Sequence, residues 1–236
     1  MDSLAGLREA RPETALLFDV DGTLAPIVAR PELAVVPQAT RAELERLAAA
    51  YLLVACISGR AGEEAAALVG VEGIRYVGNH GLELDPRAAG LSGAIAAFRE
   101  GIGLPVEDKG LSLSYHYREA DDEEAARTTL EAVAERARAE GLEARWGRKV
   151  LEIRPRAAAN KGTAVSALLA EAGARRGLYA GDDTTDLDAF AALAEAGLDR
   201  FVRVAISSVE GPPELVAAAD LVLAGPDELA GLLATL

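Results

Sequence analysis

Residues 16–24 read Leu-Leu-Phe-Asp-Val-Asp-Gly-Thr-Leu, an apolar run that ends in two aspartates, a glycine and a hydroxyl residue. The apolar and β-favouring residues over 14–20 predict a buried strand. Its carboxyl end then presents Asp19 and Asp21 at the edge of the sheet where α/β proteins bind ligands. Because buried carboxylates are costly without partners, we expect a metal ion or another cation beside them.

An acidic surface turn and an EF-hand loop are two other interpretations of this stretch. An EF-hand loop beginning at Asp19 requires glycine where Leu24 stands and glutamate where Arg30 stands. The EF-hand is therefore excluded, whereas a plain turn stays open on these residues alone. In the chemical interpretation, Asp19 is a nucleophile and Asp21, two residues on, reaches the same substrate as a general acid.

The chain has 236 residues, a formal net charge of −14 and one cysteine, Cys56. This length allows one large domain, or a core with a smaller inserted one. The negative charge argues against nucleic acid or an anionic membrane as a partner, and an anionic substrate then requires local cations. Neither a disulfide framework nor a membrane span nor a signal peptide is indicated. We expect a cytoplasmic protein.

Hydrophobic periodicity predicts two rhythms along the chain. Up to residue 77 and again from residue 160, strands and helices alternate, which is typical of a doubly wound parallel sheet. The predicted strands of this part cover residues 14–20, 51–57, 74–77, 178–180, 201–206 and 221–223, and the helices cover 39–50, a segment ending at Gly70, 160–172 and a segment ending at 196.

The stretch between these parts predicts an antiparallel α+β insert, because short strands follow one another through tight turns. Its helices are expected over 88–101 and 121–140, and its strands over 111–118, 142–146 and 149–154. The sequence thus predicts an α/β core, a Rossmann-like doubly wound sheet formed by residues 1–82 and 157–236, with an inserted cap domain over residues 83–156.

A second acidic stretch, Gly181–Asp186, follows the predicted strand over 178–180. One aspartate at a helix start is explained as a cap. Three of them, Asp182, Asp183 and Asp186, beside another acidic strand end favour a Mg²⁺ site. Capping stays an alternative for Asp183 and Asp186.

Two further stretches supply groups that can hold phosphate. Ser58-Gly59-Arg60 follows the second predicted strand, where the hydroxyl and the N–H groups of the next helix suit phosphate oxygens, although Ser-Gly is also a common turn. Lys161 stands at a predicted helix start, where the helix dipole disfavours a cation. A lysine in this position is explained if it balances the charge of a bound phosphate. All these groups fall at one edge of the sheet.

Together, the stretch 19–23, Ser58, Lys161 and the stretch 181–183 resemble the four motifs of the haloacid-dehalogenase-like (HAD) phosphatases, and the insert lies where that superfamily carries C2 caps. Residues 181–190 more narrowly resemble the signature of the trehalose-6-phosphate phosphatase family. Further stretches that resemble this family are residues 78–81, 107–110, 116–118 and 151–155. Leu187 departs from the pattern, which usually has an acidic residue there.

The resemblance implies a Mg²⁺-dependent phosphomonoesterase that converts trehalose 6-phosphate to trehalose and phosphate, the final step of trehalose biosynthesis, through an aspartyl-phosphate intermediate. The roles it implies are Asp19 as nucleophile, Asp21 as acid and then base, Ser58 and Lys161 as phosphate ligands, Asp19, the carbonyl of Asp21 and Asp182 as Mg²⁺ ligands, and Asp183 and Asp186 as residues that orient Asp182 and Lys161.

Substrate binding is expected from two groups of polar residues. They are Gly59, Arg60, Asn79 and His80 in the core, and Glu107, Lys109, His116, Arg118 and Glu152 in the cap. The cap residues are equally compatible with exposed strand positions. Charged hydrogen-bonding groups, however, discriminate between sugars better than apolar walls do, and the resemblance favours this sugar-binding interpretation.

Two other functions stay open at this point. One is a HAD phosphatase for another sugar phosphate, such as mannosyl-3-phosphoglycerate or sucrose 6-phosphate. The other is a non-catalytic sugar-phosphate-binding protein, against which the retained Asp19, Asp21, Lys161 and Asp182 argue. The expected partner is the small-molecule substrate, a separate trehalose-phosphate synthase is a candidate partner, and we expect a monomer.

Overall fold

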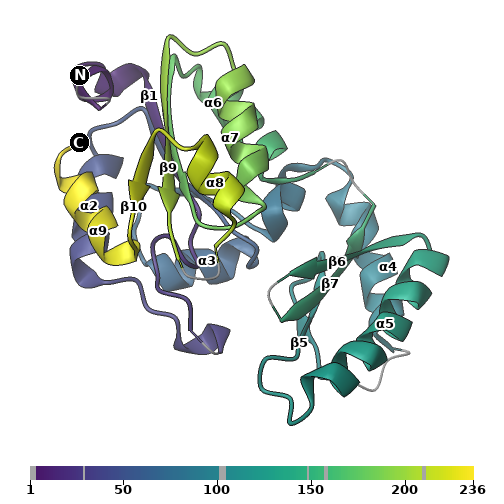
Figure 1. Ribbon diagram of the computed structural model, residues 1–236. Helices are drawn as coiled ribbons and strands as arrows, with labels where there is room; N and C mark the ends of the chain where they lie inside the picture. The colour runs from purple at the N-terminus through teal and green to yellow at the C-terminus, as the bar shows by residue number, and fades with distance from the viewer. Residues whose placement is uncertain (1–3, 29, 101–104, 148, 157–158, 209–210) are drawn as a thin grey trace. The chain divides into compact units, whose positions relative to one another are not determined.

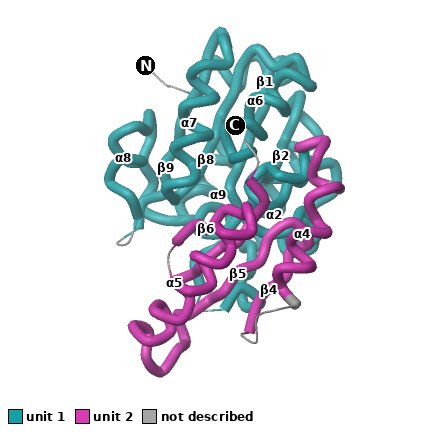
Figure 2. The backbone as a smooth tube through the Cα atoms, turned by 90° about the vertical axis from the view of Figure 1, so that its right-hand side faces the viewer, with its two compact units in different colours: residues 1–84, 159–236 teal, residues 85–158 magenta. Residues whose placement is uncertain are grey.

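The computed structural model describes residues 4–28, 30–100, 105–147, 149–156, 159–208 and 211–236. The chain divides into two compact units, residues 1–84 with 159–236 and residues 85–158 (Figure 2). The borders lie at 84 and 158, whereas the sequence predicts them at 82 and 156.

The larger unit is built on a parallel sheet with the strand order β10-β9-β8-β1-β2-β3. Figure 1 labels β1, β9 and β10 of this sheet. Its strands are β1 (Thr14–Phe18), β2 (Leu53–Ile57), β3 (Arg75–Val77), β8 (Arg176–Gly181), β9 (Arg200–Ile206) and β10 (Leu221–Leu223). β1 pairs with β2 on one side and with β8 on the other, so the chain winds outward from it in both directions. This confirms the predicted doubly wound sheet and places its switch point, where such folds bind ligands, at β1 and β8.

Helices cover both faces of this sheet. Leu16 and Phe18 of β1 belong to a core with α1 (Ala5–Glu9), α2 (Gln38–Ala48), α3 (Gly62–Val69) and α9 (Pro226–Ala234). Ala15 and Leu17 belong to a second core with α6 (Lys161–Ala172), α7 (Asp186–Glu195) and α8 (Pro213–Ala218). Because alternate strand residues point to opposite faces, a strand covered on both sides is apolar throughout.

The smaller unit has an antiparallel sheet with the order β4-β5-β7-β6. Its elements are α4 (Ala88–Glu100), β4 (Glu107–Asp108), β5 (Leu113–His116), α5 (Glu123–Ala139), β6 (Leu142–Gly147) and β7 (Val150–Pro155). Leu113 and Tyr115 of β5 and Leu151 and Ile153 of β7 form a core with residues of α4 and α5. The other face of the sheet is left to polar side chains. The predicted α+β insert is confirmed.

Several predicted bounds differ from the structure. β1 ends at Phe18 rather than at residue 20, because a tight turn follows in which Gly22 N–H donates to Ala25 O at 2.7 Å. The sequence does not predict α1, α8, α9 or β4, although prolines at the first position of α8 and α9, Pro213 and Pro226, are a known start signal. Three 3-10 segments, Arg11–Glu13, Pro31–Leu33 and Asn79–Leu84, were also not predicted. The predicted end of one helix at residue 101 lies outside the described residues.

Two predicted helix ends are confirmed. α3 and α6 stop at Gly70 and Gly173, which have φ values of 66° and 65° in the left-handed region that favours glycine. Among the helices that the structure describes, none is both long enough and apolar enough to cross a bilayer.

Candidate active site

Asp19 follows β1 directly, and its carboxylate is buried beside Lys161. The Asp19 N–H donates to Ala180 O at 2.9 Å, which continues the pairing of β1 with β8. The residue is 5% exposed, and Lys161 Nζ donates to its Oδ1 at 2.7 Å. Burial raises the pKa of Asp19, Lys161 opposes this, and the carboxylates of Asp186 and Asp182 raise the pKa further. This local excess of negative charge favours a bound cation.

Lys161 is the first residue of α6 and lies between two carboxylates. A capping box starts the helix, since Asn160 Oδ1 accepts from Thr163 N–H at 2.8 Å and Thr163 Oγ1 accepts from Asn160 N–H at 2.9 Å. Lys161 is 2% exposed and donates to Asp19 and to Asp186, each at 2.7 Å. Burial lowers the pKa of Lys161, but Asp186 and Asp19 outweigh burial and raise it overall. The ammonium group is therefore held charged at a helix end that otherwise disfavours it.

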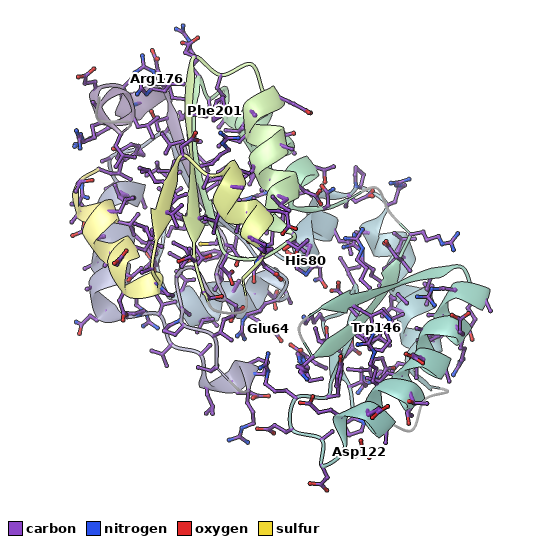
Figure 3. The ribbon with its side chains drawn as sticks, viewed as in Figure 1. Glu64, His80, Asp122, Trp146, Arg176 and Phe201 are labelled. Atoms are coloured by element: carbon purple, nitrogen blue, oxygen red, sulfur yellow. The ribbon has the colours of Figure 1, made fainter. Side chains whose placement is uncertain are left out.

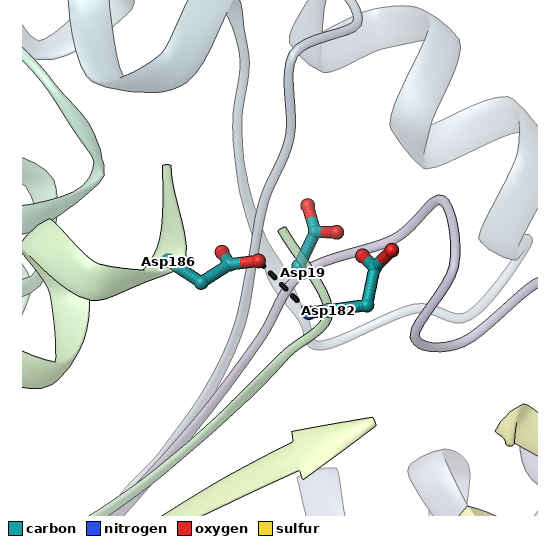
Figure 4. Close-up of side chains that lie close together, drawn as sticks. All are labelled: Asp19, Asp182 and Asp186. Carbon is teal, nitrogen blue, oxygen red and sulfur yellow. Dashed lines mark hydrogen bonds between the residues drawn. The ribbon is translucent and has the colours of Figure 1, made fainter. Parts of the chain in front are cut away.

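Asp186 organises the acidic loop. Its Oδ1 accepts from Lys161 Nζ and Tyr179 O–H, each at 2.7 Å. Its Oδ2 accepts from the N–H groups of Asp182 and Asp183, each at 2.9 Å, and Figure 4 shows the bond from Asp182. A carboxylate has about four lone-pair positions, so these donors from the described part of the chain use all of them. Asp186 thus orients Lys161 and the loop, and has no lone pair left for a metal ion.

Asp19 and Asp182 are the residues best suited to a divalent cation. Carboxylate oxygens of Asp19, Asp182 and Asp186 lie within 4.8 Å of one another, and Asp186 is already saturated. Gly22, with φ +90°, lies against Asp182 so closely that a Cβ there would be 2.2 Å from Asp182 Oδ2. Glycine therefore lets the turn after β1 approach the acidic loop. Buried carboxylate oxygens with an excess of negative charge fit a hard divalent cation.

Asp21 is paired with Arg60, which the sequence does not predict. Arg60 Nε donates to Asp21 Oδ2 at 2.7 Å and Nη2 donates to Oδ1 at 2.6 Å. The same Nη2 donates to Pro31 O at 3.0 Å. Two parallel bonds of this kind are the geometry of an ionised carboxylate with a guanidinium group. Arg60, predicted to bind substrate, thus also contacts the predicted acid.

The predicted residues of the two loops after β2 and β3 lie together. Ser58 is buried, and its Oγ accepts from Arg60 N–H at 3.1 Å. Across the loops, His80 N–H donates to Ser58 O and Asn79 N–H donates to Arg60 O, each at 2.8 Å. A Cβ at Gly59 would be 2.7 Å from His80 Nε2, so the imidazole lies directly against this glycine.

Two residues of this edge were missed in the sequence. Tyr179 is fully buried, and burial raises the pKa of its hydroxyl, which stays protonated and donates to Asp186. A tyrosine within an apolar strand is a usable signal, because a buried hydroxyl needs a partner. Glu83 accepts hydrogen bonds from the backbone of Gly62 and Gly78, each at 2.8 Å, and nothing in the sequence indicates that contact.

The polar face of the cap sheet carries most of the predicted sugar-binding residues. The strand register aligns Glu107 with Ser114, Ser114 with Glu152, and Glu152 with Arg145. Because directly paired residues point to the same face, these four side chains form one row across the sheet. Ser114 and Arg145 are additions that depend on strand pairing and are not readable from local sequence.

Two of the remaining predicted cap residues, Lys109 and His116, lie beside Glu107 at one end of this row. His116 Nε2 is 2.6 Å from Glu107 Oε2, and Lys109 Nζ is 3.9 Å from the same oxygen. Arg118 lies in a turn beyond β5, so the predicted strand over 111–118 is too long. Tyr117 N–H still donates to Lys149 O at 3.0 Å, and the strand then ends in a turn in which Ala120 N–H donates to Tyr117 O at 3.3 Å.

A family model described as trehalose-phosphatase matches residues 17–91 and 100–224 of the chain. The chain belongs to this family. A trehalose-phosphate phosphatase of Mycobacterium marinum is 34% identical over 81% of this chain and 54% of its own length. A Mycobacterium tuberculosis protein described as an uncharacterized glycosyl hydrolase is 38% identical over 80% of this chain but only 16% of its own length. The chain thus spans about half, or much less, of these curated relatives.

Solved structures agree with the family assignment. Aspergillus fumigatus trehalose-6-phosphate phosphatase is 27% identical, covers 99% of this chain and 95% of its own, and superposes with a TM-score of 0.61. A haloacid dehalogenase-like hydrolase from Bacteroides thetaiotaomicron, 15% identical with a TM-score of 0.61 over 94% of this chain and 98% of its own, shows the same fold. The family member described here therefore has a HAD-like fold.

Proposed function

We propose that this chain hydrolyses trehalose 6-phosphate to trehalose and phosphate, with Mg²⁺ as its cofactor. The observation that carries the proposal is the buried network in which Lys161 joins Asp19 to Asp186, beside Asp182, at the carboxyl ends of β1 and β8. Membership of the trehalose-phosphatase family and the names of the relatives support the substrate.

In this proposal Asp19 attacks phosphorus and becomes an aspartyl-phosphate, which water then hydrolyses. Ser58 and Lys161 bind phosphate oxygens, and Lys161 is the local cation that a chain of net charge −14 needs for an anionic substrate. Asp19, Asp182 and the backbone carbonyl of Asp21 would hold Mg²⁺. The ion supplies positive charge that lets an anionic phosphate approach a carboxylate.

Asp21 transfers the proton in both steps. It protonates the leaving sugar oxygen first and then takes a proton from the attacking water. The bidentate pair with Arg60 suits the carboxylate form that Asp21 has at the start of the second step. In the first step Asp21 carries a proton on one carboxyl oxygen. The hydrogen bond from Arg60 to that oxygen is then lost, and the bond to the other oxygen stays.

The polar face of the cap sheet is proposed to bind the sugar. Glu107, Ser114, Glu152 and Arg145 form the row, and Lys109 and His116 lie beside Glu107. Together with Arg118, which follows β5, these groups offer donors and acceptors to the hydroxyl groups of a disaccharide. A site made of such groups rejects substrates that lack a matching hydroxyl, because its polar groups are then left without partners.

The test is a phosphate-release assay with Mg²⁺ on a panel of trehalose 6-phosphate, sucrose 6-phosphate, mannosyl-3-phosphoglycerate and glucose 6-phosphate. We expect the highest kcat/KM for trehalose 6-phosphate. A higher kcat/KM for another sugar phosphate of the panel would contradict trehalose 6-phosphate as the substrate but not the proposed phosphatase chemistry. Calorimetric binding of trehalose 6-phosphate without phosphate release contradicts the enzymatic proposal.

A further inference from the structure

Glu83, which lies in the 3-10 segment after β3, joins two loops of the larger unit. Its Oε1 accepts from Gly62 N–H at 2.8 Å and from Asn79 Nδ2 at 3.2 Å, and its Oε2 accepts from Gly78 N–H at 2.8 Å. Gly62 is the first residue of α3, whose N-terminal N–H groups favour a carboxylate. A single side chain therefore ties the start of α3 to the loop after β3.

Both backbone donors are glycines. A Cβ at Gly78 would be 2.2 Å from Gly62 N, so the neighbouring backbone requires glycine there. A Cβ at Gly62 would be 2.4 Å from Glu83 Oε2 and would displace the carboxylate from its present position. The two loops thus approach the carboxylate as closely as backbone can, which makes the contact specific rather than incidental.

The segment held in this way contains Arg60. Arg60 lies two residues before Gly62, and its carbonyl oxygen accepts from Asn79 N–H at 2.8 Å. Glu83 accepts hydrogen bonds from Gly62, which follows Arg60 in the same loop, and from the side chain of Asn79, the residue whose N–H bonds to Arg60. Glu83 therefore supports, from both neighbouring contacts, the backbone from which the Arg60 guanidinium group reaches Asp21.

We propose that Glu83 is a positioning residue, which aims Asp21 for proton transfer by holding the backbone of Arg60. The inference rests on the proposed function, since it assigns Asp21 the role of acid. A sugar leaves as an alcohol and needs that proton, whereas p-nitrophenolate leaves without one. Loss of the Glu83 contact is therefore expected to slow the sugar phosphate more than p-nitrophenyl phosphate.

The experiment compares Glu83→Gln with wild type on both substrates with Mg²⁺. Glutamine keeps the shape of the side chain but replaces one acceptor oxygen by an NH₂ group that faces an N–H donor. The quantity to measure is kcat/KM, because it covers the steps up to departure of the leaving group and not the later hydrolysis of the intermediate. We expect kcat/KM for trehalose 6-phosphate to fall about tenfold and that for p-nitrophenyl phosphate to stay within about twofold.

A matched control is Glu64→Gln, which removes a carboxylate from an exposed position in the first turn of the same helix, α3 (Figure 3). It should leave both substrates unchanged. If Glu83 serves only to cap α3, Glu83→Gln lowers kcat/KM for both substrates equally, through a smaller folded fraction, and the proposal is wrong. Unchanged kinetics in Glu83→Gln refute it as well.

A measurement without substrate separates this inference from the proposed function. The experiment follows the NMR signal of the Arg60 Nε–H, which donates to Asp21, in wild type and in Glu83→Gln. In Glu83→Gln its exchange with solvent should accelerate roughly fivefold, as expected when a supporting hydrogen bond is lost. Wild type that hydrolyses neither substrate refutes the proposed function, whereas unchanged Arg60 exchange refutes the role of Glu83 whatever the substrate is.

Discussion

The acidic edge of the larger unit and the polar face of the cap sheet both gather charged side chains, but they hold them differently. Asp19, Lys161 and Asp186 are at most 5% exposed and bond to one another at 2.7 Å. In the cap, Ser114 and Glu152 in the middle of the row are also buried, at 2% and 9% exposed. At the end of the row by Glu107, however, the side chains of Glu107, Lys109 and His116 are 27%, 11% and 42% exposed, and the ion pair of Glu107 with Lys109 is long, at 3.9 Å.

This difference follows from what each region is proposed to do. A nucleophile and its metal ion must be held to within a fraction of an ångström, and burial with saturated hydrogen bonds provides that rigidity. Groups that bind sugar hydroxyls exchange their bonds with water for bonds with the substrate, so partial solvation suits them. The core should therefore fail completely when one group is changed, and the cap should fail gradually.

The largest effect is expected from Asp19→Asn. It removes the nucleophile, so kcat for trehalose 6-phosphate should fall by about 10⁴-fold or more in a phosphate-release assay. Burial raises the pKa of Asp19 above its unfolded value, so at neutral pH the ionised carboxylate opposes folding of the metal-free protein. The melting temperature of Asp19→Asn in chelator should then be at least that of wild type.

The control for this variant is Asp188→Asn, on an exposed position of α7, which should keep wild-type kcat. An Asp19→Asn enzyme with substantial turnover contradicts the assignment of the nucleophile. A much lower melting temperature in chelator contradicts the account of its charge.

The second largest loss of activity is expected when the metal ion is removed. Chelation of divalent cations should lower phosphate release by about 10³-fold or more, and added Mg²⁺ should restore it. Mg²⁺ should also raise the melting temperature of wild type, because it binds the folded state, and should do so much less in Asp182→Asn. Full activity in excess chelator, or an equal thermal shift in Asp182→Asn, contradicts the metal site.

Two lysine variants test the difference between the core and the cap by their free energies of unfolding. Lys161→Ala leaves Asp19 and Asp186 buried without their cation, so the free energy of unfolding should fall by about 3–5 kcal/mol in urea titrations. Lys109→Ala should cost about 1 kcal/mol or less, since its ion pair is long. Similar losses in the two variants would remove the distinction between core and cap.

The smallest effect is expected in the cap. Glu107→Ala should lower kcat/KM for trehalose 6-phosphate by about tenfold to a hundredfold, the loss of one or two hydrogen bonds to a charged group, while p-nitrophenyl phosphate changes little. Glu131→Ala, on an exposed position of α5, is the control and should leave both substrates unchanged. Equal losses on the two substrates in Glu107→Ala argue against sugar binding by this face.

Much of the larger unit is predictable because its signals are local. The apolar runs that become β1, β2 and β9 are covered on both faces, and Gly70 and Gly173 end their helices by a backbone conformation that glycine adopts freely. The cap is harder to predict. Its strands are short, its sheet is polar on one face, and β4 has only two residues, so propensity carries little information.

By itself, the sequence determined the doubly wound core, the inserted α+β unit, the acidic strand ends at Asp19 and Asp182, and the lysine at the start of α6. These depend on hydrophobic period, glycine and proline chemistry, and the rule that parallel strands end at one edge. Only the tertiary structure decided that Arg60 pairs with Asp21, that the Tyr179 hydroxyl donates to Asp186, and that the Glu83 carboxylate lies between two glycines. The Arg60–Asp21 pair joins residues far apart in the chain, and the Glu83 contacts depend on close approach of backbone, which no local pattern encodes. The sequence does signal that a buried Tyr179 hydroxyl needs a partner, but not which residue supplies it.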